Sequence, residues 1–169
     1  MRSQRCRLPG IALVFVWLAS RDGKLLACAW QDPDRPHDLT PLTDIPRADL
    51  RAPPFDPSDY ARDAATWQPT DAVPPGSAHA RRVWAALSTI PVGEVRTYAE
   101  IAACVGSAPR AVGQACRTNP WPLFVPCHRV VSSRFGTSGD IGGYAGDQGG
   151  VLARVKRQLL VHEGVLRGS

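Results

Sequence analysis

Two short apolar runs rich in β-forming residues lie near the start of the chain, at residues 11–19 and 25–30. Charged residues and an Asp22-Gly23 pair separate them, a pattern typical of a hairpin turn. The arginines before the first run, with Leu25-Leu26-Ala27-Cys28 after it, also resemble a lipoprotein signal peptide. A signal peptide keeps its apolar region unbroken up to the cleavage site, so we expect a hairpin instead. No run approaches the roughly eighteen apolar residues of a membrane helix, and no membrane partner is expected.

Residues 31–76 carry ten prolines and little periodicity. Such a segment does not sustain long helices or central strands, so we expect irregular chain around the hairpin and one short helix at residues 61–67. A Pro-Pro-Gly linker at residues 73–77 ends this segment. The sequence therefore predicts a divergent N-terminal domain at residues 1–76 and a second domain at residues 77–169.

Helical periodicity begins after that linker. Residues 79–90 carry apolar side chains at core spacing and stop at Pro91, while residues 97–100 (Thr-Tyr-Ala-Glu) form a capping box that begins a helix to about residue 104. A turn at Gly106 leads to a second helix at residues 108–117, and two short helices around such a turn predict a helix-turn-helix. A last helix covers residues 152–162, with Gly164 as its C′ residue. The expected fold class is α/β (α+β), a small N-terminal β-hairpin or sheet followed by a mostly helical, winged-helix-like domain.

Cys127 lies between Pro126 and His128 at the end of an apolar run. Pro126 restricts the backbone that leads into the cysteine. His128 exchanges a proton near neutral pH and Arg129 adds positive charge, so both are expected to lower the pKa of the thiol. A rigid cysteine beside a proton carrier is a candidate nucleophile, although free cysteine also packs often as a small buried hydrophobe.

The positive charge is concentrated in the second half of the chain. Residues 1–76 hold nine Lys/Arg and ten Asp/Glu, and residues 77–169 hold eleven and five, so the net charges of −1 and +6 give the total of +5. Eighteen of the twenty basic residues are arginines, which bind phosphate in bidentate fashion. This distribution favours a polyanionic partner, with ordinary solubilising charge as the alternative.

Cysteine usage points to a reducing compartment, which we take to be the cytoplasm. The five cysteines are odd in number and form no CxxC pair, which argues against a disulfide framework and a ribbon-type zinc site. Four zinc ligands are available in principle, but their spacing fits no standard finger: Cys6, Cys28, His37 and His79. No metal or other cofactor is therefore predicted.

Two further segments leave alternatives open. In the helix at residues 108–117, the small residues Ala111, Gly113 and Ala115 allow close approach either to another surface or to neighbouring helices. Residues 132–150 are rich in glycine and serine, and Tyr144 stands among them. That segment is either a flexible linker or the wall of a pocket for a flat ring.

Taken together, the motifs of the second half resemble those of the O6-alkylguanine-DNA alkyltransferases, which are also called methylated-DNA–protein-cysteine methyltransferases. The resemblance covers roughly residues 80–165 in the family's order, and its motifs are Val-Trp-Ala-Ala-Leu at 83–87, Ile-Pro-Val-Gly-Glu-Val at 90–95, Arg-Ala-Val-Gly at 110–113, Asn-Pro at 119–120, Pro-Cys-His-Arg-Val at 126–130, Gly-Gly-Tyr at 142–144 and Leu-Leu-Val-His-Glu-Gly at 159–164. It implies a monomeric DNA repair protein that flips O6-alkylguanine out of double-stranded DNA through the minor groove, with little sequence preference. The protein would then move the alkyl group irreversibly onto its own cysteine.

The resemblance also implies a role for each matching residue. Cys127 would accept the alkyl group, His128 would take the thiol proton through a water, Glu163 would orient His128, and Asn119 would hold the hinge before the cysteine. The residues expected to contact DNA are Tyr98, Arg110, Ala111, Gly113 and Arg117. Those expected to form the alkylguanine pocket are Tyr98, Cys116, Val130, Tyr144 and Ala145.

The sequence departs from the family in its divergent first half and its long 132–150 segment, and Ala145 stands where serine is common. Three other functions are weighed against alkyl transfer. A non-catalytic lesion sensor of the same fold would replace the acceptor cysteine, which is present here. A helix-turn-helix regulator would leave His128, Glu163 and Asn119 unexplained, and a Cys-His hydrolase would need an oxyanion hole.

Overall fold

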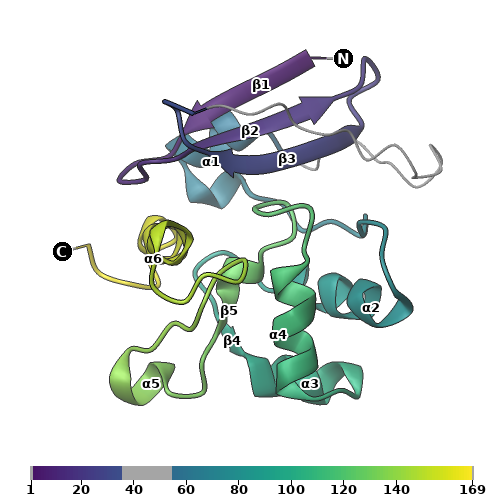
Figure 1. Cartoon of the computed structure of the whole chain (residues 1–169), viewed down its shortest axis with the longest axis vertical. Helices are drawn as coiled ribbons and strands as arrows, with labels where there is room; N and C mark the ends of the chain where they lie inside the picture. The colour runs from purple at the N-terminus through teal and green to yellow at the C-terminus, as the bar shows by residue number, and fades with distance from the viewer. Residues whose placement is uncertain (1, 36–54, 169) are drawn as a thin grey trace.

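The computed structural model describes residues 2–35 and 55–168. Its N-terminal part is an antiparallel sheet of β1 (Arg2–Arg7), β2 (Val14–Ala19) and β3 (Leu25–Gln31) in the order β1-β2-β3 (Figure 1). β2 and β3 are the expected hairpin, and Gly23 takes a φ of 82° in its turn. β1 was not expected, because its sequence Arg-Ser-Gln-Arg-Cys-Arg has no apolar alternation. As an edge strand it gains order from backbone pairing with β2 rather than from burial of side chains.

The expected short helix begins earlier than residue 61. α1 (Pro57–Arg62) is followed by the short 3₁₀ helix η2 (Ala64–Thr66). Asp56 caps α1 by accepting a hydrogen bond from the Ser58 backbone N–H at 2.7 Å, and Pro57 occupies the first helical position. Asp56 and Pro57 therefore mark the start of this helix, a signal that was overlooked because the segment contains so many prolines. Residues 36–54 of the proline-rich segment, including His37, lie outside the described residues.

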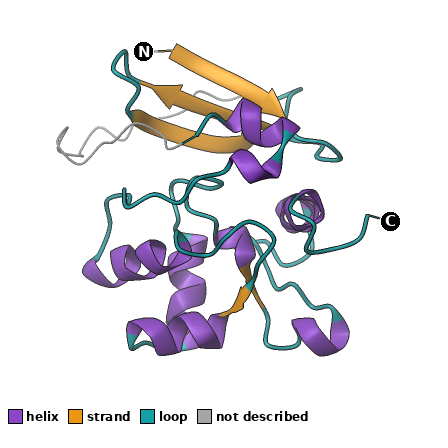
Figure 2. Cartoon of the chain, turned by 180° about the vertical axis from the view of Figure 1, so that it is seen from behind, coloured by secondary structure: helices purple, strands orange, loops and turns teal. Residues whose placement is uncertain are grey.

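The second half contains the four helices that the sequence predicts: α2 (Ala78–Leu87), α3 (Tyr98–Val105), α4 (Pro109–Arg117) and α6 (Val151–His162). The capping box is present, because the Thr97 hydroxyl accepts from the Glu100 backbone and the Glu100 carboxylate accepts from the Thr97 backbone. Gly106 turns the chain from α3 to α4 with a φ of 63°. The helix-turn-helix is therefore confirmed (Figure 2).

Shorter elements connect these helices. β4 (Arg96–Thr97) pairs in parallel with β5 (Val130–Val131), which directly follows the 3₁₀ helix η3 (Cys127–Arg129). The glycine-rich segment includes α5 (Phe135–Ser138), which the sequence did not predict. Because η3 lies between a buried apolar segment and a strand, the backbone of Cys127 is held from both sides.

Aromatic side chains join the N-terminal part to the segment that precedes Cys127. Phe15 and Phe55 lie with their ring centroids 6.1 Å and 5.2 Å from that of Phe124. The Trp67 indole donates to the Leu123 carbonyl at 3.1 Å. One hydrophobic cluster includes residues of both halves, so the expected domain boundary near residue 76 stays a prediction. Within residues 2–35 and 55–168, no helix is long and apolar enough to cross a membrane.

Candidate active site

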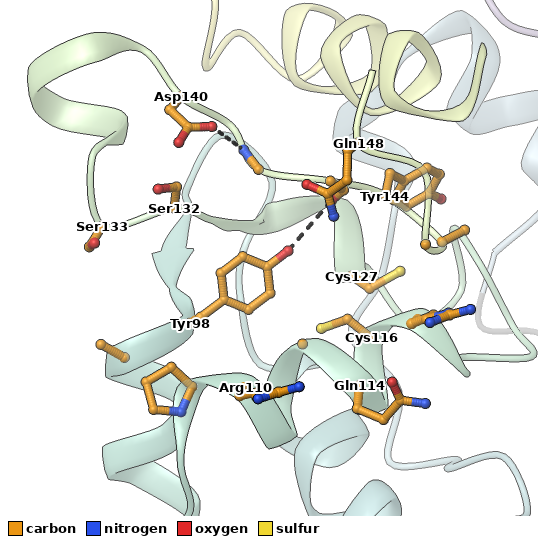
Figure 3. Close-up of a pocket in the computed structure, with 18 of the residues that line it drawn as sticks. Tyr98, Arg110, Gln114, Cys116, Cys127, Ser132, Ser133, Asp140, Tyr144 and Gln148 are labelled. Carbon is orange, nitrogen blue, oxygen red and sulfur yellow. Dashed lines mark hydrogen bonds between the residues drawn. The ribbon is translucent and has the colours of Figure 1, made fainter. Parts of the chain in front are cut away.

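A cavity of about 690 Å³ opens between α4, the start of α3 and the glycine-rich segment (Figure 3). Tyr98 and the exposed residues of α4 form one wall, and residues 132–134, 140, 142–146 and 148 contribute the other. Cys127 lies at its floor with 4% of its surface exposed. The glycine-rich segment is thus a pocket wall rather than a linker, which decides between the two alternatives that the sequence left open.

Asn119 holds the sulfur of Cys127. Its side-chain amide donates to the Val125 carbonyl at 2.9 Å and to Cys127 Sγ at 3.2 Å, while its side-chain oxygen accepts from the Trp121 backbone at 3.0 Å. The side chain therefore closes the turn after α4 and aims an N–H donor at the sulfur. Such a donor stabilises a thiolate more than a thiol.

The charge around Cys127 differs from the sequence-based prediction. Burial raises the pKa of the Cys127 thiol above its ordinary value, while the Asn119 hydrogen bond and the nearby Lys156 ammonium act in the opposite direction. Arg129 was expected to lower this pKa, but its guanidinium is fully buried and binds Glu163. The predicted low pKa of the thiol is therefore wrong, because burial outweighs the groups that act to lower it. A pKa raised above the ordinary value favours the protonated thiol at neutral pH.

Glu163 is the centre of a buried polar cluster directly after α6. Its Oε2 accepts from Arg129 Nε at 2.8 Å, and its Oε1 accepts from Arg129 at 2.8 Å, from Tyr60 Oη at 2.7 Å and from His128 Nε2 at 2.9 Å. Burial acts to raise the pKa of Glu163, but the charges and hydrogen bonds of its partners hold it well below the usual range. Glu163 is therefore a carboxylate, and the hydrogen on the His128 ring lies on Nε2.

His128 is neutral in this arrangement. Burial lowers the pKa of its fully enclosed imidazole, and the Glu163 carboxylate offsets only part of that effect. With Nε2 bonded to Glu163, the other ring nitrogen, Nδ1, is an acceptor without a hydrogen-bond partner among residues 2–35 and 55–168. A neutral histidine with a free acceptor nitrogen next to Cys127 in the chain is suited to accept a proton.

Lys156 and Trp30 are site residues that sequence reasoning missed. Lys156 Nζ donates to the carbonyls of Val130 at 2.6 Å and Gly143 at 3.0 Å, and burial lowers its pKa to about 8. Trp30 Nε1 on β3 donates to the Tyr144 hydroxyl at 3.2 Å. The only signal for Lys156 was its place on the apolar side of α6, between Val155 and Leu159.

The predicted pocket residues fall into two groups. Tyr98, Cys116 and Tyr144 line the cavity (Figure 3), and Ala145 lines it as well. Val130 does not line it, because its side chain is fully buried and its carbonyl accepts from Lys156. Burial raises the pKa of Tyr98 well above its ordinary value, so its hydroxyl remains a hydrogen-bond donor.

The outer face of α4 is the candidate DNA contact. Arg110 and Arg117 are exposed and line the cavity mouth, as does the half-buried Gly113. Ala111 is half-buried and lies beside the cavity without lining it. Ala115 is buried and its carbonyl accepts from the Trp84 indole at 2.9 Å, so this small residue serves packing inside the domain.

The glycine-rich wall approaches its neighbours closely. A methyl group on Gly142, whose φ is 71°, would lie 3.3 Å from the Tyr98 ring, and one on Gly146 would lie 3.0 Å from the Arg117 side chain. Ala145 between them has a φ of 50°, in the left-handed region. The wall is therefore shaped by backbone conformations that favour glycine, and Ala145 itself lines the cavity.

Metal ligands are not assembled in the part of the chain that the structure describes. Among residues 2–35 and 55–168, no group of three or more His, Cys, Asp or Glu side chains is arranged to hold a metal ion. Cys28 Sγ instead donates to the Pro120 and Pro122 carbonyls at 3.7 and 3.8 Å. The four-ligand hypothesis stays untested, since His37 lies outside the described residues.

The fold and the site define a helix-turn-helix protein with a buried candidate nucleophile beside a Glu–His pair. Comparison with known families gives a match to the model of the 6-O-methylguanine DNA methyltransferase, DNA binding domain, at residues 78–165. This match covers 88 of the 169 residues, more than half of the chain. The chain belongs to the 6-O-methylguanine DNA methyltransferase family.

Individual relatives agree with this membership. A constitutive methylated-DNA–protein-cysteine methyltransferase of Bacillus subtilis is 52% identical over 75 residues, which are 43% of this chain and 43% of the relative. One from Archaeoglobus fulgidus is 43% identical over 53% of this chain and 58% of the relative. The matched part thus spans about half the length of these relatives. The crystal structure of Mycobacterium tuberculosis OGT in complex with DNA aligns over 96% of this chain and 92% of that chain, with a TM-score of 0.62 and 29% identity.

Proposed function

We propose that this chain repairs O6-alkylguanine in double-stranded DNA by moving the alkyl group onto Cys127, once per molecule. The observation that carries the proposal is the position of Cys127, at the floor of a cavity beside the helix-turn-helix, with the Asn119 amide on its sulfur. The family and the DNA complex of the structural relative support the same reaction.

The reaction begins with the proton of Cys127. Glu163 holds the His128 proton on Nε2, so Nδ1 is free to take the thiol proton through a water molecule. The Asn119 N–H and the Lys156 ammonium then stabilise the thiolate. The sulfur attacks the carbon bound to guanine O6, a C–S bond forms, and the C–O6 bond breaks. The C–O6 bonding electrons leave with the guanine, whose O6 becomes a carbonyl. The guanine anion accepts a hydrogen bond at N3 from the Tyr98 hydroxyl, whose pKa burial raises, and takes its proton from water.

The cavity fits an extruded base. An alkyl group on a stacked guanine is out of reach of a buried thiol, so the nucleotide must leave the duplex, at a cost of a few kcal/mol. The cavity volume of about 690 Å³ lies within the range of small-molecule sites. Arg110, exposed at the start of α4, would take the place of the extruded nucleotide in the duplex. Arg117 would contact phosphate, and Ala111 and Gly113 would allow the helix close approach to the minor groove. Such binding reads little sequence, which suits a search for damage.

Intact-mass spectrometry tests the proposal. Incubation with an excess of duplex containing O6-methylguanine should add about one methylene mass per chain and then stop, with the modification on Cys127. Cys127→Ala should bind the duplex and gain no mass. Cys116→Ala is the matched control, because it removes the other thiol that lines the cavity and should still be modified. Binding without any mass gain by the unaltered chain would indicate a lesion sensor or a regulator, and continuing turnover would indicate a hydrolase.

A further inference from the structure

Tyr60 connects the N-terminal part of the chain to the Glu–His pair. Its hydroxyl donates to Glu163 Oε1 at 2.7 Å, across 103 residues of sequence. Tyr60 is fully buried and Glu163 is 6% exposed, so water does not compete for this bond. Tyr60 lies on α1, outside the family match at residues 78–165.

The hydroxyl shares its acceptor atom with His128. Glu163 Oε1 accepts hydrogen bonds from Tyr60, from His128 Nε2 and from Arg129, so all three donors stabilise the negative charge on the same oxygen. A carboxylate that accepts more hydrogen bonds attracts a neighbouring proton less strongly. The Tyr60 hydroxyl therefore reduces the attraction of Glu163 for a second proton on the His128 ring.

The other groups around this cluster do not replace the hydroxyl. Arg129 and Lys156 bring positive charge toward His128. Among the neighbours of Tyr60, the charge of Arg129 lowers the pKa of its hydroxyl and Tyr144 raises it. The centroid of the His162 ring lies 5.1 Å from that of the Tyr60 ring. His162 Nε2 lies 2.6 Å from the Tyr60 carbonyl, on the backbone side. Tyr60 is the donor to Glu163 that reaches it from the N-terminal part of the described chain.

We propose that Tyr60 is a positioning residue of alkyl transfer, whose hydroxyl fixes Glu163 and lowers the proton affinity of His128. This inference rests on the proposed function. It makes the N-terminal part a contributor to the reaction, because α1 delivers the hydroxyl to the cluster that prepares His128 as a base.

A structural role for the same hydroxyl has a different signature. If Tyr60 only fills space and satisfies a polar group, its loss lowers stability and reduces transfer equally at all pH values. If it sets the proton affinity of His128, its loss makes His128 protonate at higher pH. Transfer then slows on the acid side of the pH profile, while the rate at higher pH changes little.

The test is the pH profile of single-turnover methyl transfer from duplex O6-methylguanine, measured between pH 5 and 9. Tyr60→Phe keeps the ring and removes the hydroxyl. We expect the midpoint of its acid limb to rise by about half a pH unit, which makes transfer about threefold slower below the midpoint. Ser88→Ala is the matched control, because it removes a buried hydroxyl that donates to the Trp84 carbonyl away from Glu163. Its midpoint should equal that of the unaltered chain.

An unchanged midpoint in Tyr60→Phe, with or without a uniform loss of rate, would overturn the inference. A ¹⁵N NMR titration of the His128 ring in the full chain provides an independent measurement that needs no DNA. The titration midpoint of His128 should move up in Tyr60→Phe and stay in place in Ser88→Ala. Failure of the unaltered chain to transfer methyl would reject the proposed function, while this titration would still decide whether Tyr60 acts on His128.

Discussion

Replacing Glu163 with glutamine should destabilise the protein strongly, because it removes the charge that Arg129 needs. The fully buried guanidinium donates to Glu163 twice and to the Ile90 carbonyl once, and it stacks 3.9 Å from the centre of the Trp67 ring. A glutamine carbonyl can replace one carboxylate oxygen, but its NH₂ group must then face a donor at the other position. Loss of one partner of a buried ion pair leaves an uncompensated charge. We expect the free energy of unfolding to fall by about 3 kcal/mol.

Urea denaturation of Glu163→Gln and of the unaltered chain at pH 7 measures this difference. Glu94→Gln is the matched control, since Glu94 pairs with Arg96 at 2.8 Å while both side chains are about half exposed. An exposed pair of this kind contributes only a few tenths of a kcal/mol. A loss in Glu163→Gln as small as that in the control would refute the reasoning.

The same variant has a predictable pH dependence. The pKa of Glu163 is lower in the folded protein than in the unfolded chain, where it is about 4.3. As the pH falls, the unfolded chain takes up this proton first, so the stabilisation is complete above about pH 5 and declines below about pH 4. The stability difference between the unaltered chain and Glu163→Gln should therefore be the same at pH 7 and pH 6 and smaller at pH 3.5. A difference that stays constant down to pH 3.5 would contradict the assignment of a charged Glu163.

Three further substitutions separate binding from chemistry. Asn119→Ala should slow methyl transfer about tenfold or more, because the thiolate loses its N–H donor; single-turnover rates measure this at matched folded fractions. Lys156→Met should raise the pH midpoint of methyl transfer, because the Lys156 ammonium lowers the pKa of Cys127. The difference in transfer rate between this variant and the unaltered chain should become smaller above about pH 8, where Lys156 loses its proton. Arg110→Ala should slow transfer from duplex DNA and leave transfer from the free O6-methylguanine base unchanged, with stability within about 0.5 kcal/mol because the side chain is exposed.

Local sequence patterns predicted much of the helical half. The four main helices lie within three residues of the expected bounds, because capping residues, Pro91 and apolar periodicity all act locally. The glycines around Tyr144 gave a pocket wall as one of two alternatives, and the structure places residues 142–146 and 148 in the wall. The resemblance, rather than any pattern, supplied the pairing of His128 with Glu163, and the structure shows their contact at 2.9 Å.

Long-range contacts explain what the sequence did not reveal. Tyr60 lies in a proline-rich segment without periodicity, and its partner is 103 residues away. Trp30 reads as an ordinary strand residue until the fold brings it to Tyr144. Lys156 has the residue type of an exposed helix position, yet two carbonyls from different segments enclose its ammonium group. Each of these roles depends on segments that meet only in the folded chain.

The pKa shifts of Cys127 and His128 bear on how the thiol would be protected if the protein reacts once, as proposed. Burial raises the pKa of Cys127 and lowers that of His128, so both are neutral in the free protein. A protonated thiol is a poor nucleophile toward other electrophiles in solution. In the proposed reaction, the thiolate forms only when His128 takes the proton, and the Asn119 and Lys156 groups that stabilise it are already in place. The proposed reaction therefore needs no permanently ionised cysteine, because the groups that accept the proton and stabilise the thiolate already surround the sulfur.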